Sequence, residues 1–227
     1  MILQIETATT VCSVALAENG QTIALKEADQ RNIHAEKITL FIDEVVKAAG
    51  KSYADINAIA VSSGPGSYTG LRIGVSAAKG LSFALDKPLI AVETLQAMAN
   101  GYAEMHDIDT GTLLCPMVDA RRMEVFTAVF DELGDRLIKP TSAEIIDERS
   151  FSDLLSTNKI IFFGDGAEKC RDVLGSHANA VIAGDFANSA RYMSRKANEK
   201  YLSEDFKDVA YFEPYYLKDF IAGKKSI

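Results

Sequence analysis

A glycine-rich turn is the first feature of this sequence whose residues could do chemistry. The stretch from Ile59 to Leu85 reads IAVSSGPGSYTGLRIGVSAAKGLSFAL, which is an apolar run, then a turn with several glycines, then a helical pattern. Turns of this kind often cradle phosphate, because the free N–H groups at the start of a helix attract anions. The residues of such an anion loop would be Gly64, Gly66, Ser67, Thr69 and Arg72.

The spacing of these glycines departs from that of the well-known nucleotide-binding loops. A Walker loop needs Gly, four residues, Gly, Lys, then Ser or Thr, and no glycine here begins that pattern. Gly64, Gly66 and Gly70 are spaced GxGxxxG instead of GxGxxG, and a GxSxG nucleophile elbow is absent. Phosphate binding is therefore the lesser alternative for this turn.

The helix expected over residues 71–85 gives a second signal. Its only charged residues are Arg72 and Lys79, and small residues recur four apart along one stripe. A helix that is apolar nearly all round is buried on two sides, and a glycine within a helix costs roughly 1 kcal/mol. Either both sides pack inside one lobe or one side forms a protein–protein interface, and we favour the interface. It would use Ile38, Phe41 and Val45 of the preceding helix with Gly70, Gly74, Val75 and Ala78.

Two carboxylates are candidates for acids that line a cleft. Glu6 ends the first apolar strand, and Asp119 follows a strand and precedes Arg121 and Arg122. The alternative for Asp119 is a carboxylate satisfied by neighbouring arginines or backbone N–H groups. No pair of carboxylates stands out as an acid and a base, so we expect no catalytic residue and no autonomous catalysis.

The histidines do not have the spacing of a metal site. None of His34, His106 and His177 has a second histidine four residues on, and no HxxE spacing occurs. A single histidine makes no metal site without convergent ligands. We therefore predict no metal site, and expect His34 to cap a helix or to lie at an interface.

The elements that position these residues occur in the same order twice. Residues 1–106 read as three strands followed by helix, strand, helix, strand and helix, and residues 107–227 repeat this order. Two successive units of this kind predict an α/β protein whose two lobes face one another across a cleft. The predicted fold is therefore two ribonuclease-H-like lobes in tandem.

Composition limits the class of protein further. The chain has 227 residues and a formal net charge of −8, which argues against unaided binding of nucleic acid. Three widely spaced cysteines, Cys12, Cys115 and Cys170, fit reduced thiols in a cytoplasm. The N-terminus lacks the basic and apolar regions of a signal peptide, and no apolar run reaches membrane length. We expect a soluble cytoplasmic protein.

The stretch GPGSYTGLRIGVSAAKGL, residues 64–81, closely resembles the bacterial TsaB (YeaZ) family. Further matches run along the chain at Glu6-Thr7, at His34, at DARRMEV (residues 119–125) and at EPYYLKD (residues 213–219). The sequence departs from the family pattern at three residues. Glu6 stands where the family usually has Asp, Tyr68 where it has Phe, and Lys218 where it has Arg.

The resemblance implies a two-lobed fold of the class that contains actin-like ATPases, sugar kinases and Hsp70. It implies a partner of the catalytic paralogue TsaD, which transfers threonylcarbamoyl from its adenylate to N6 of adenosine 37 in tRNA, to form t6A. An ATPase, TsaE, joins the two, and TsaC supplies the adenylate. Self-paired dimers would use the surface that TsaD occupies on the first lobe.

The same resemblance implies that the chain binds no cofactor alone, with ATP or ADP only within the complex, and that it meets tRNA only through the complex. The rival hypothesis is a nucleotide-binding ATPase or small-molecule kinase of the same two-lobed class, which would use Glu6, Asp119 and the glycine loops. A sequence-specific RNA-binding module is disfavoured by the net charge.

Overall fold

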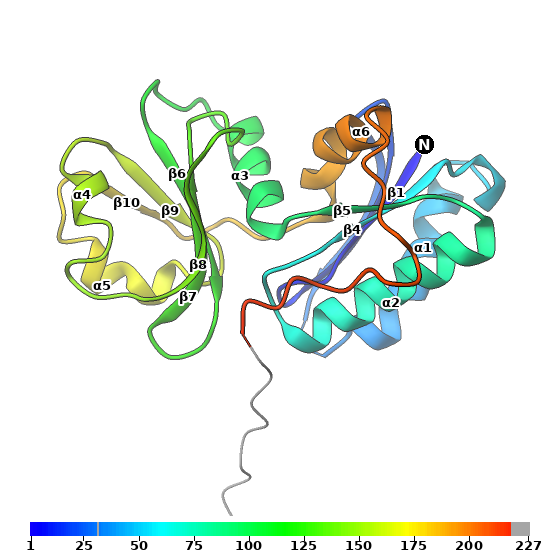
Figure 1. Cartoon of the computed structure of the whole chain (residues 1–227), viewed down its shortest axis with the longest axis horizontal. Helices are drawn as coiled ribbons and strands as arrows, with labels where there is room; N and C mark the ends of the chain where they lie inside the picture. Colours follow the sequence, from blue (N-terminus) through cyan, green and yellow to red (C-terminus); the bar gives the residue numbers. More distant parts are fainter. Residues whose placement is uncertain (31, 219–227) are drawn as a thin grey trace, which may run out of the picture.

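Two five-stranded mixed sheets form the frame of the molecule (Figure 1). The computed structural model describes residues 1–30 and 32–218. The strand orders are β3-β2-β1-β4-β5 and β10-β9-β6-β7-β8, which are the same order when the second sheet is counted from β6. The repeat predicted from the sequence is therefore confirmed, and with it the fold class.

The first sheet and its helices alternate as the apolar patterns predict. Asn19 and Gly20 join β2 to β3 with φ of 51° and 79°, as expected of a tight hairpin turn. The elements are β1 (Ile2–Glu6), β2 (Val11–Glu18), β3 (Gln21–Asp29), α1 (His34–Ala48), η1 (Tyr53–Asp55), β4 (Ala58–Ser62), α2 (Tyr68–Leu85), β5 (Leu89–Val92) and α3 (Thr94–Met105).

The second sheet has shorter helices around it. Its elements are β6 (Leu113–Asp119), β7 (Glu124–Phe130), β8 (Leu137–Ile145), α4 (Ser152–Leu155), β9 (Ile160–Phe163), η2 (Glu168–Cys170), α5 (Arg171–Leu174) and β10 (Ala180–Ala183). The chain then crosses back and forms η3 (Ala190–Met193) and α6 (Ser194–Leu202). Among the described residues, no helix is long and apolar enough to cross a bilayer.

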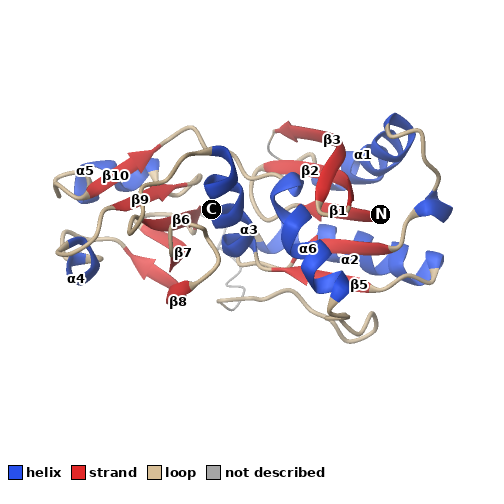
Figure 2. Ribbon diagram, turned by 90° about the horizontal axis from the view of Figure 1, so that it is seen from above, coloured by secondary structure: helices blue, strands red, loops and turns tan. Residues whose placement is uncertain are grey.

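The last helix packs on the first lobe, which corrects the predicted second domain of residues 107–227. Figures 1 and 2 show α6 over the first sheet, where it contacts β1, β3 and β5, whereas α3 lies between the lobes and contacts β6 and β7. Polar groups hold this arrangement: Ser194 Oγ donates to Gln4 Oε1 at 3.0 Å, and Ala190 N donates to Ser13 Oγ at 3.0 Å. These partners are far apart in sequence, so the order of elements could not reveal the crossing.

The lobes share one hydrophobic core. Its aromatic rings come from α3, β9, η3 and residues 184–189, which we call the crossing segment. The ring centroids are 4.3 Å apart for Tyr102–Phe163, 4.9 Å for Phe163–Phe186 and 5.1 Å for Phe186–Tyr192. Gly101 makes room for this stack, since a Cβ there would lie 2.2 Å from the Tyr192 ring. The junction between the lobes is therefore packed like a protein interior.

Residues 203–218, which we call the C-terminal strap, run back along the first lobe. The N–H of Lys207 donates to the carbonyl of Leu89 at 2.8 Å, which continues the first sheet past β5. Lys79 Nζ on α2 donates to the carbonyl of Phe212 at 3.0 Å. The strap therefore covers one flank of α2, as Figure 1 shows.

Candidate functional site

The glycine turn packs against the β1–β2 turn of its own lobe. The N–H of Ser67 donates to the carbonyl of Ala8 at 2.7 Å, and Thr7 Oγ1 donates to the carbonyl of Gly70 at 2.8 Å. A Cβ on Gly70 would lie 2.0 Å from the Thr7 carbonyl oxygen, and one on Gly66 would lie 2.4 Å from that of Ala8. Both positions require glycine, because a Cβ would collide with these carbonyl oxygens. The main chain that comes so close belongs to this protein and not to a partner.

The outer side of the turn meets the C-terminal strap. The N–H of Tyr215 donates to the carbonyl of Ser63 at 2.7 Å, and Gly64 has a φ of 106° with the carbonyl of Tyr215 beside it. Arg72 is held by the strap as well, because its Nε donates to the Tyr216 hydroxyl at 3.2 Å. The Ser67 N–H and the Arg72 guanidinium of the predicted anion loop are thus engaged within the molecule. Thr69 is exposed, and phosphate binding at this loop stays a prediction.

The residues predicted for the partner interface are buried inside the first lobe, which corrects that assignment. The side chains of Ile38, Phe41, Val45, Val75 and Ala78 are at most 5% exposed, and Gly70 and Gly74 are buried with them. A Cβ on Gly74 would lie 2.2 Å from Thr7 Oγ1. The stripe of small residues therefore lets α2 approach β1, so this side of the helix packs inside one lobe.

Other apolar residues of α1 and α2 remain partly or fully exposed. We call this set the α1–α2 surface: Leu40, Gly80 and Phe83, which are exposed, and Ile73 and Ala77, which are half-buried. Phe83 is 84% exposed and Leu40 is 52% exposed. Gly80 has no atom within 4 Å of the position where a Cβ would stand. The structure buries one side of α2 inside the first lobe and leaves Gly80 and Phe83 of the other side exposed.

Glu6 is buried at the end of β1. Its side chain is 0% exposed, its Oε1 accepts the N–H of Ala8 at 2.5 Å, and its Oε2 has no hydrogen-bond partner among the described residues. Burial raises the pKa of Glu6 to about 6, against the opposing effect of the Ala8 N–H. Ser62 and Asn188 are its other polar neighbours. Glu6 thus faces the interior of the lobe junction.

Asp119 is a paired surface acid. Its Oδ1 contacts Lys169 Nζ and accepts the N–H of Arg121 at 2.9 Å, and the side chain is 46% exposed. Its own N–H donates to Asp165 Oδ1 at 3.0 Å. The arrangement matches the alternative of a carboxylate satisfied by neighbouring groups. Glu6 and Asp119 lie in different lobes, and neither lines the cleft described next.

A cavity of about 300 Å³ lies between the lobes. Four carboxylates line it, from Asp29, Asp165, Glu168 and Asp185, and no lysine or arginine is among the described lining residues, although Arg171 pairs with Glu168 beside it. Burial raises the pKa of Asp165 above its usual value. Glu168 is paired with Arg171, so three of the four carboxylates would repel phosphate groups. That a nucleotide binds only within the complex stays a prediction. The sequence pattern could not bring these four carboxylates together, because they come from both lobes.

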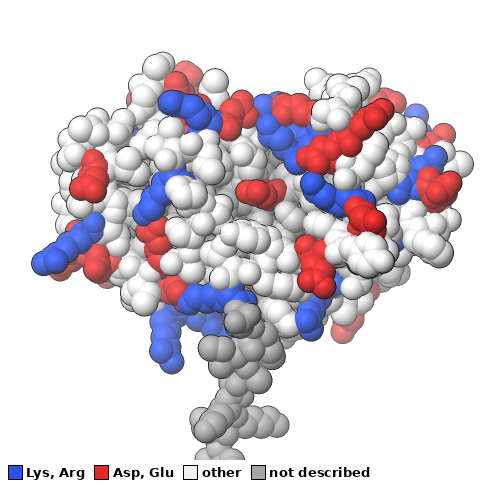
Figure 3. Space-filling model, in the orientation of Figure 1, with Lys and Arg blue, Asp and Glu red and all other residues white. Residues whose placement is uncertain are grey.

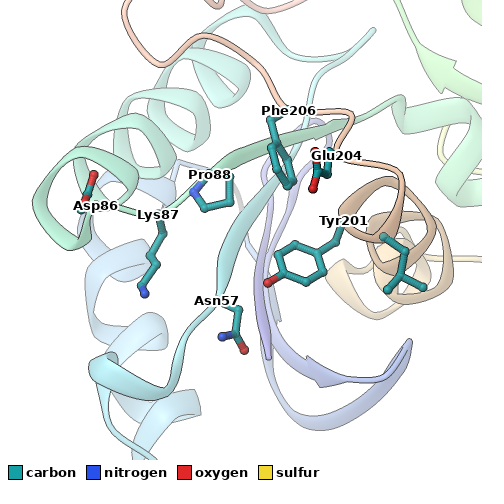
Figure 4. A pocket seen from close by; sticks show the side chains of 8 residues that line it. Asn57, Asp86, Lys87, Pro88, Tyr201, Glu204 and Phe206 are labelled. Carbon is teal, nitrogen blue, oxygen red and sulfur yellow. The ribbon is translucent and has the colours of Figure 1, made fainter.

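A second hollow of about 480 Å³ lies at the outer edge of the first lobe (Figure 4). Tyr201 from α6 and Phe206 from the strap form one side, and Asn57 and Lys87 lie across from them. The two rings are 6.0 Å apart. Ordinary lobe packing accounts for these residues.

The three histidines lie apart, each with a local partner. His34 Nε2 is 3.3 Å from the carbonyl of Val11, His106 Nδ1 is 3.0 Å from that of Tyr102, and His177 Nδ1 accepts the N–H of Asn179 at 3.3 Å. Within residues 1–30 and 32–218, no group of three His, Cys, Asp or Glu side chains could hold a metal ion.

Comparison with known proteins finds t6A biosynthesis proteins that match nearly the whole chain. The family model described as TsaD, tRNA N6-adenosine threonylcarbamoyltransferase, matches residues 26–222. The tRNA threonylcarbamoyladenosine biosynthesis protein TsaB of Escherichia coli K12 is 33% identical over 235 aligned positions, which cover 99% of this chain and 97% of that protein.

Solved structures show the same fold. YeaZ from Pseudomonas aeruginosa superposes with a TM-score of 0.81 at 23% identity, over 95% of this chain and 99% of that one. The activator of the 2-hydroxyisocaproyl-CoA dehydratase from Clostridium difficile gives a TM-score of 0.52 at 11% identity, over 91% and 98% of the two chains. The resemblance seen in the glycine turn is thus confirmed along the full length, and the chain belongs to the TsaB (YeaZ) family of t6A biosynthesis proteins.

Proposed function

We propose that this chain is a non-catalytic partner subunit of the bacterial complex that forms t6A at position 37 of tRNA. It pairs there with the catalytic paralogue TsaD and with the ATPase TsaE, in the cytoplasm. The observation that carries the proposal is the exposed, apolar α1–α2 surface on a chain of this family. Large apolar side chains that stay exposed, such as Leu40 and Phe83, suit a protein–protein interface.

The composition of the α1–α2 surface suits close helix packing. Phe83 would gain about 1.5–3 kcal/mol from burial, and Ala77 and Gly80 would let a second backbone come near. TsaD is a paralogue, since its family model matches this chain, so it can present an equivalent pair of helices. A second copy of this chain can do the same with two-fold symmetry, and the two pairings exclude one another.

The described acids support an accessory role. Glu6 is enclosed at the lobe junction and Asp119 is paired with Lys169, so neither is poised as a base toward a substrate in the cleft. The rival ATPase or kinase would have to bring phosphate groups into a cavity lined by four carboxylates. We therefore propose that a nucleotide binds, if at all, only in a cavity that a partner completes.

Gly80→Arg tests the pairing without disturbing the monomer. Nothing lies within 4 Å of the new Cβ, and arginine is a better helix former than glycine, so the variant should fold at least as well. A bulky charge in the middle of the α1–α2 surface should abolish co-elution with TsaD and self-association on size exclusion. Leu202→Arg, which changes a 74% exposed leucine at the end of α6, is the control and should co-elute as the wild type does. Co-elution of Gly80→Arg with TsaD would refute this surface as the interface.

A further inference from the structure

The turn between β6 and β7 carries two arginines in an uncommon conformation. Arg121 and Arg122 have φ of 69° and 48°, and both side chains are exposed. A positive φ favours Gly, Asn or Asp, because a left-handed backbone costs other residues with a Cβ roughly 1–2 kcal/mol. Gly, Asn or Asp would adopt this backbone with less strain than arginine. The arginines are therefore not explained by the conformation of the turn, and we look for a role of their side chains.

The strap brings further cations to this turn. Lys218 Nζ contacts the carboxylate of Glu124, the first residue of β7, and the N–H of Glu124 donates to the carbonyl of Arg121 at 3.1 Å. Two residues before Lys218, Tyr216 holds Arg72 of α2. The Cα atoms of residues 216 and 218 are at most about 7 Å apart. Cations from both lobes thus gather along one rim.

We call this set the arginine edge: Arg72, Arg121, Arg122 and Lys218. Figure 3 shows lysine and arginine side chains gathered at the lower border of the molecule, around the point where the described chain ends. Lys218 pairs with Glu124, and Arg72 is held by the Tyr216 hydroxyl and the Tyr68 ring. The side chains of Arg121 and Arg122 form no ion pair with any described residue. On a chain of net charge −8, the two unpaired guanidinium groups of Arg121 and Arg122 give this rim a local positive charge.

We propose that the arginine edge binds the phosphate backbone of tRNA once the chain is in its complex. This inference rests on the proposed function, because the net charge makes the chain alone a poor ligand for RNA. Arginine is well suited to bidentate contacts with phosphate. The exposed Tyr215 ring beside the edge, 46% accessible, offers a face on which an unpaired base can stack.

The surroundings favour an extended polyanion over a small one. The N–H of Asp119 links the arginine turn to Asp165, one of the four carboxylates of the cleft, so acidic side chains lie inward of the arginine turn. A free nucleotide would find no enclosed positive pocket among the described residues of that cleft. A nucleic-acid backbone can follow the rim and stay outside the acidic cavity.

The test replaces both arginines by the residues that this turn prefers. Arg121→Asn/Arg122→Gly removes two charges and relieves the backbone, so its melting temperature should equal or exceed that of the wild type. Binding of an unmodified tRNA to the complex with TsaD is measured by fluorescence anisotropy over a range of salt. We expect affinity about tenfold weaker at physiological salt and a salt slope smaller by about 1.5.

A matched control removes the same charge from the other end of the same sheet. Arg136→Ala/Lys159→Ala lies about 20 Å away along β7, beyond a Debye length of about 8 Å. Its tRNA affinity should stay near that of the wild type. Equal losses in both variants, or no loss in the turn variant, would overturn the arginine edge.

Co-elution with TsaD, recorded on the same samples, separates this inference from the proposed function. If the turn variant loses its pairing with TsaD or TsaE and keeps tRNA binding, a protein covers the edge and the inference is wrong. If the wild-type chain does not pair, the proposed function fails. The arginine edge is then judged on the chain alone at low salt with the same variants.

Discussion

Glu6 shows how burial changes the chemistry of a single side chain. It is fully enclosed, one carboxylate oxygen lacks a partner among the described residues, and its pKa is about 6 instead of the ordinary 4.5. The folded state therefore holds more protons than the unfolded state between these two values. Stability falls as pH rises through this window, because the ionised form is the one that burial disfavours.

Glu6→Gln should remove this dependence on pH. The gap between 4.5 and about 6 corresponds to about 2 kcal/mol. Relative to Glu6→Gln, the wild type should lose about that much free energy of unfolding between about pH 4 and pH 7, as measured by urea denaturation. Using the difference between the two proteins cancels the carboxylates whose pKa is lowered, such as Asp205. A flat difference would mean that Glu6 is solvated.

The sequence draws attention to Glu6, Asp119 and the glycines of α2, but it does not reveal what surrounds them. Glu6 is predicted to be a cleft acid because it ends an apolar strand. The prediction cannot include Asn188, which helps enclose Glu6, because Asn188 comes from the other end of the chain. Asp119 could be foreseen as paired, since charged neighbours follow it directly, whereas Lys169 comes from a turn far along the chain.

At the scale of elements, the glycine pattern of α2 predicts that another segment packs closely against the helix, but not which segment. Glycines four apart indicated that a backbone comes close to the helix, and the structure identifies that backbone as the β1–β2 turn. Spacing along one helix cannot tell an internal neighbour from an external one, since both require the same missing Cβ. The exposed side with Phe83 follows only once the sheet is placed.

Two glycines of α2 should respond oppositely to alanine. Gly74→Ala places a Cβ 2.2 Å from Thr7 Oγ1 and should destabilise the protein by about 1–3 kcal/mol. Gly80→Ala meets nothing within 4 Å and should stabilise it by about 0.5–1 kcal/mol. Denaturant unfolding of both variants checks this, and destabilisation by Gly80→Ala would show that the outer side of the helix is already packed.

At the scale of the whole molecule, the repeat of strands and helices was enough to predict two lobes, and the structure confirms it. It was not enough to place α6 and the strap, which return to the first lobe through contacts such as Ser194 to Gln4 and Lys207 to Leu89. A periodic pattern defines an element and its apolar face. It does not say which of the two sheets that apolar face packs on, so the position of α6 could not be predicted.

The C-terminal strap determines which parts of the first lobe stay exposed. It covers one flank of α2 through Lys79 and the outside of the glycine turn through Tyr215. These contacts leave the α1–α2 surface as the uncovered apolar side of the helix pair and place Lys218 beside the turn of Arg121. One surface would then serve the partner subunit and the other rim the nucleic acid.

We propose that the chain acts by pairing with TsaD and does no chemistry itself. The most direct measurement is mass-spectrometric quantification of t6A in tRNA after reconstitution with TsaC, TsaD and TsaE. We predict that t6A forms with the wild-type chain and with Leu202→Arg, fails with Gly80→Arg, and does not form when TsaD is left out. Formation of t6A without TsaD, or undiminished formation with Gly80→Arg, would contradict the account.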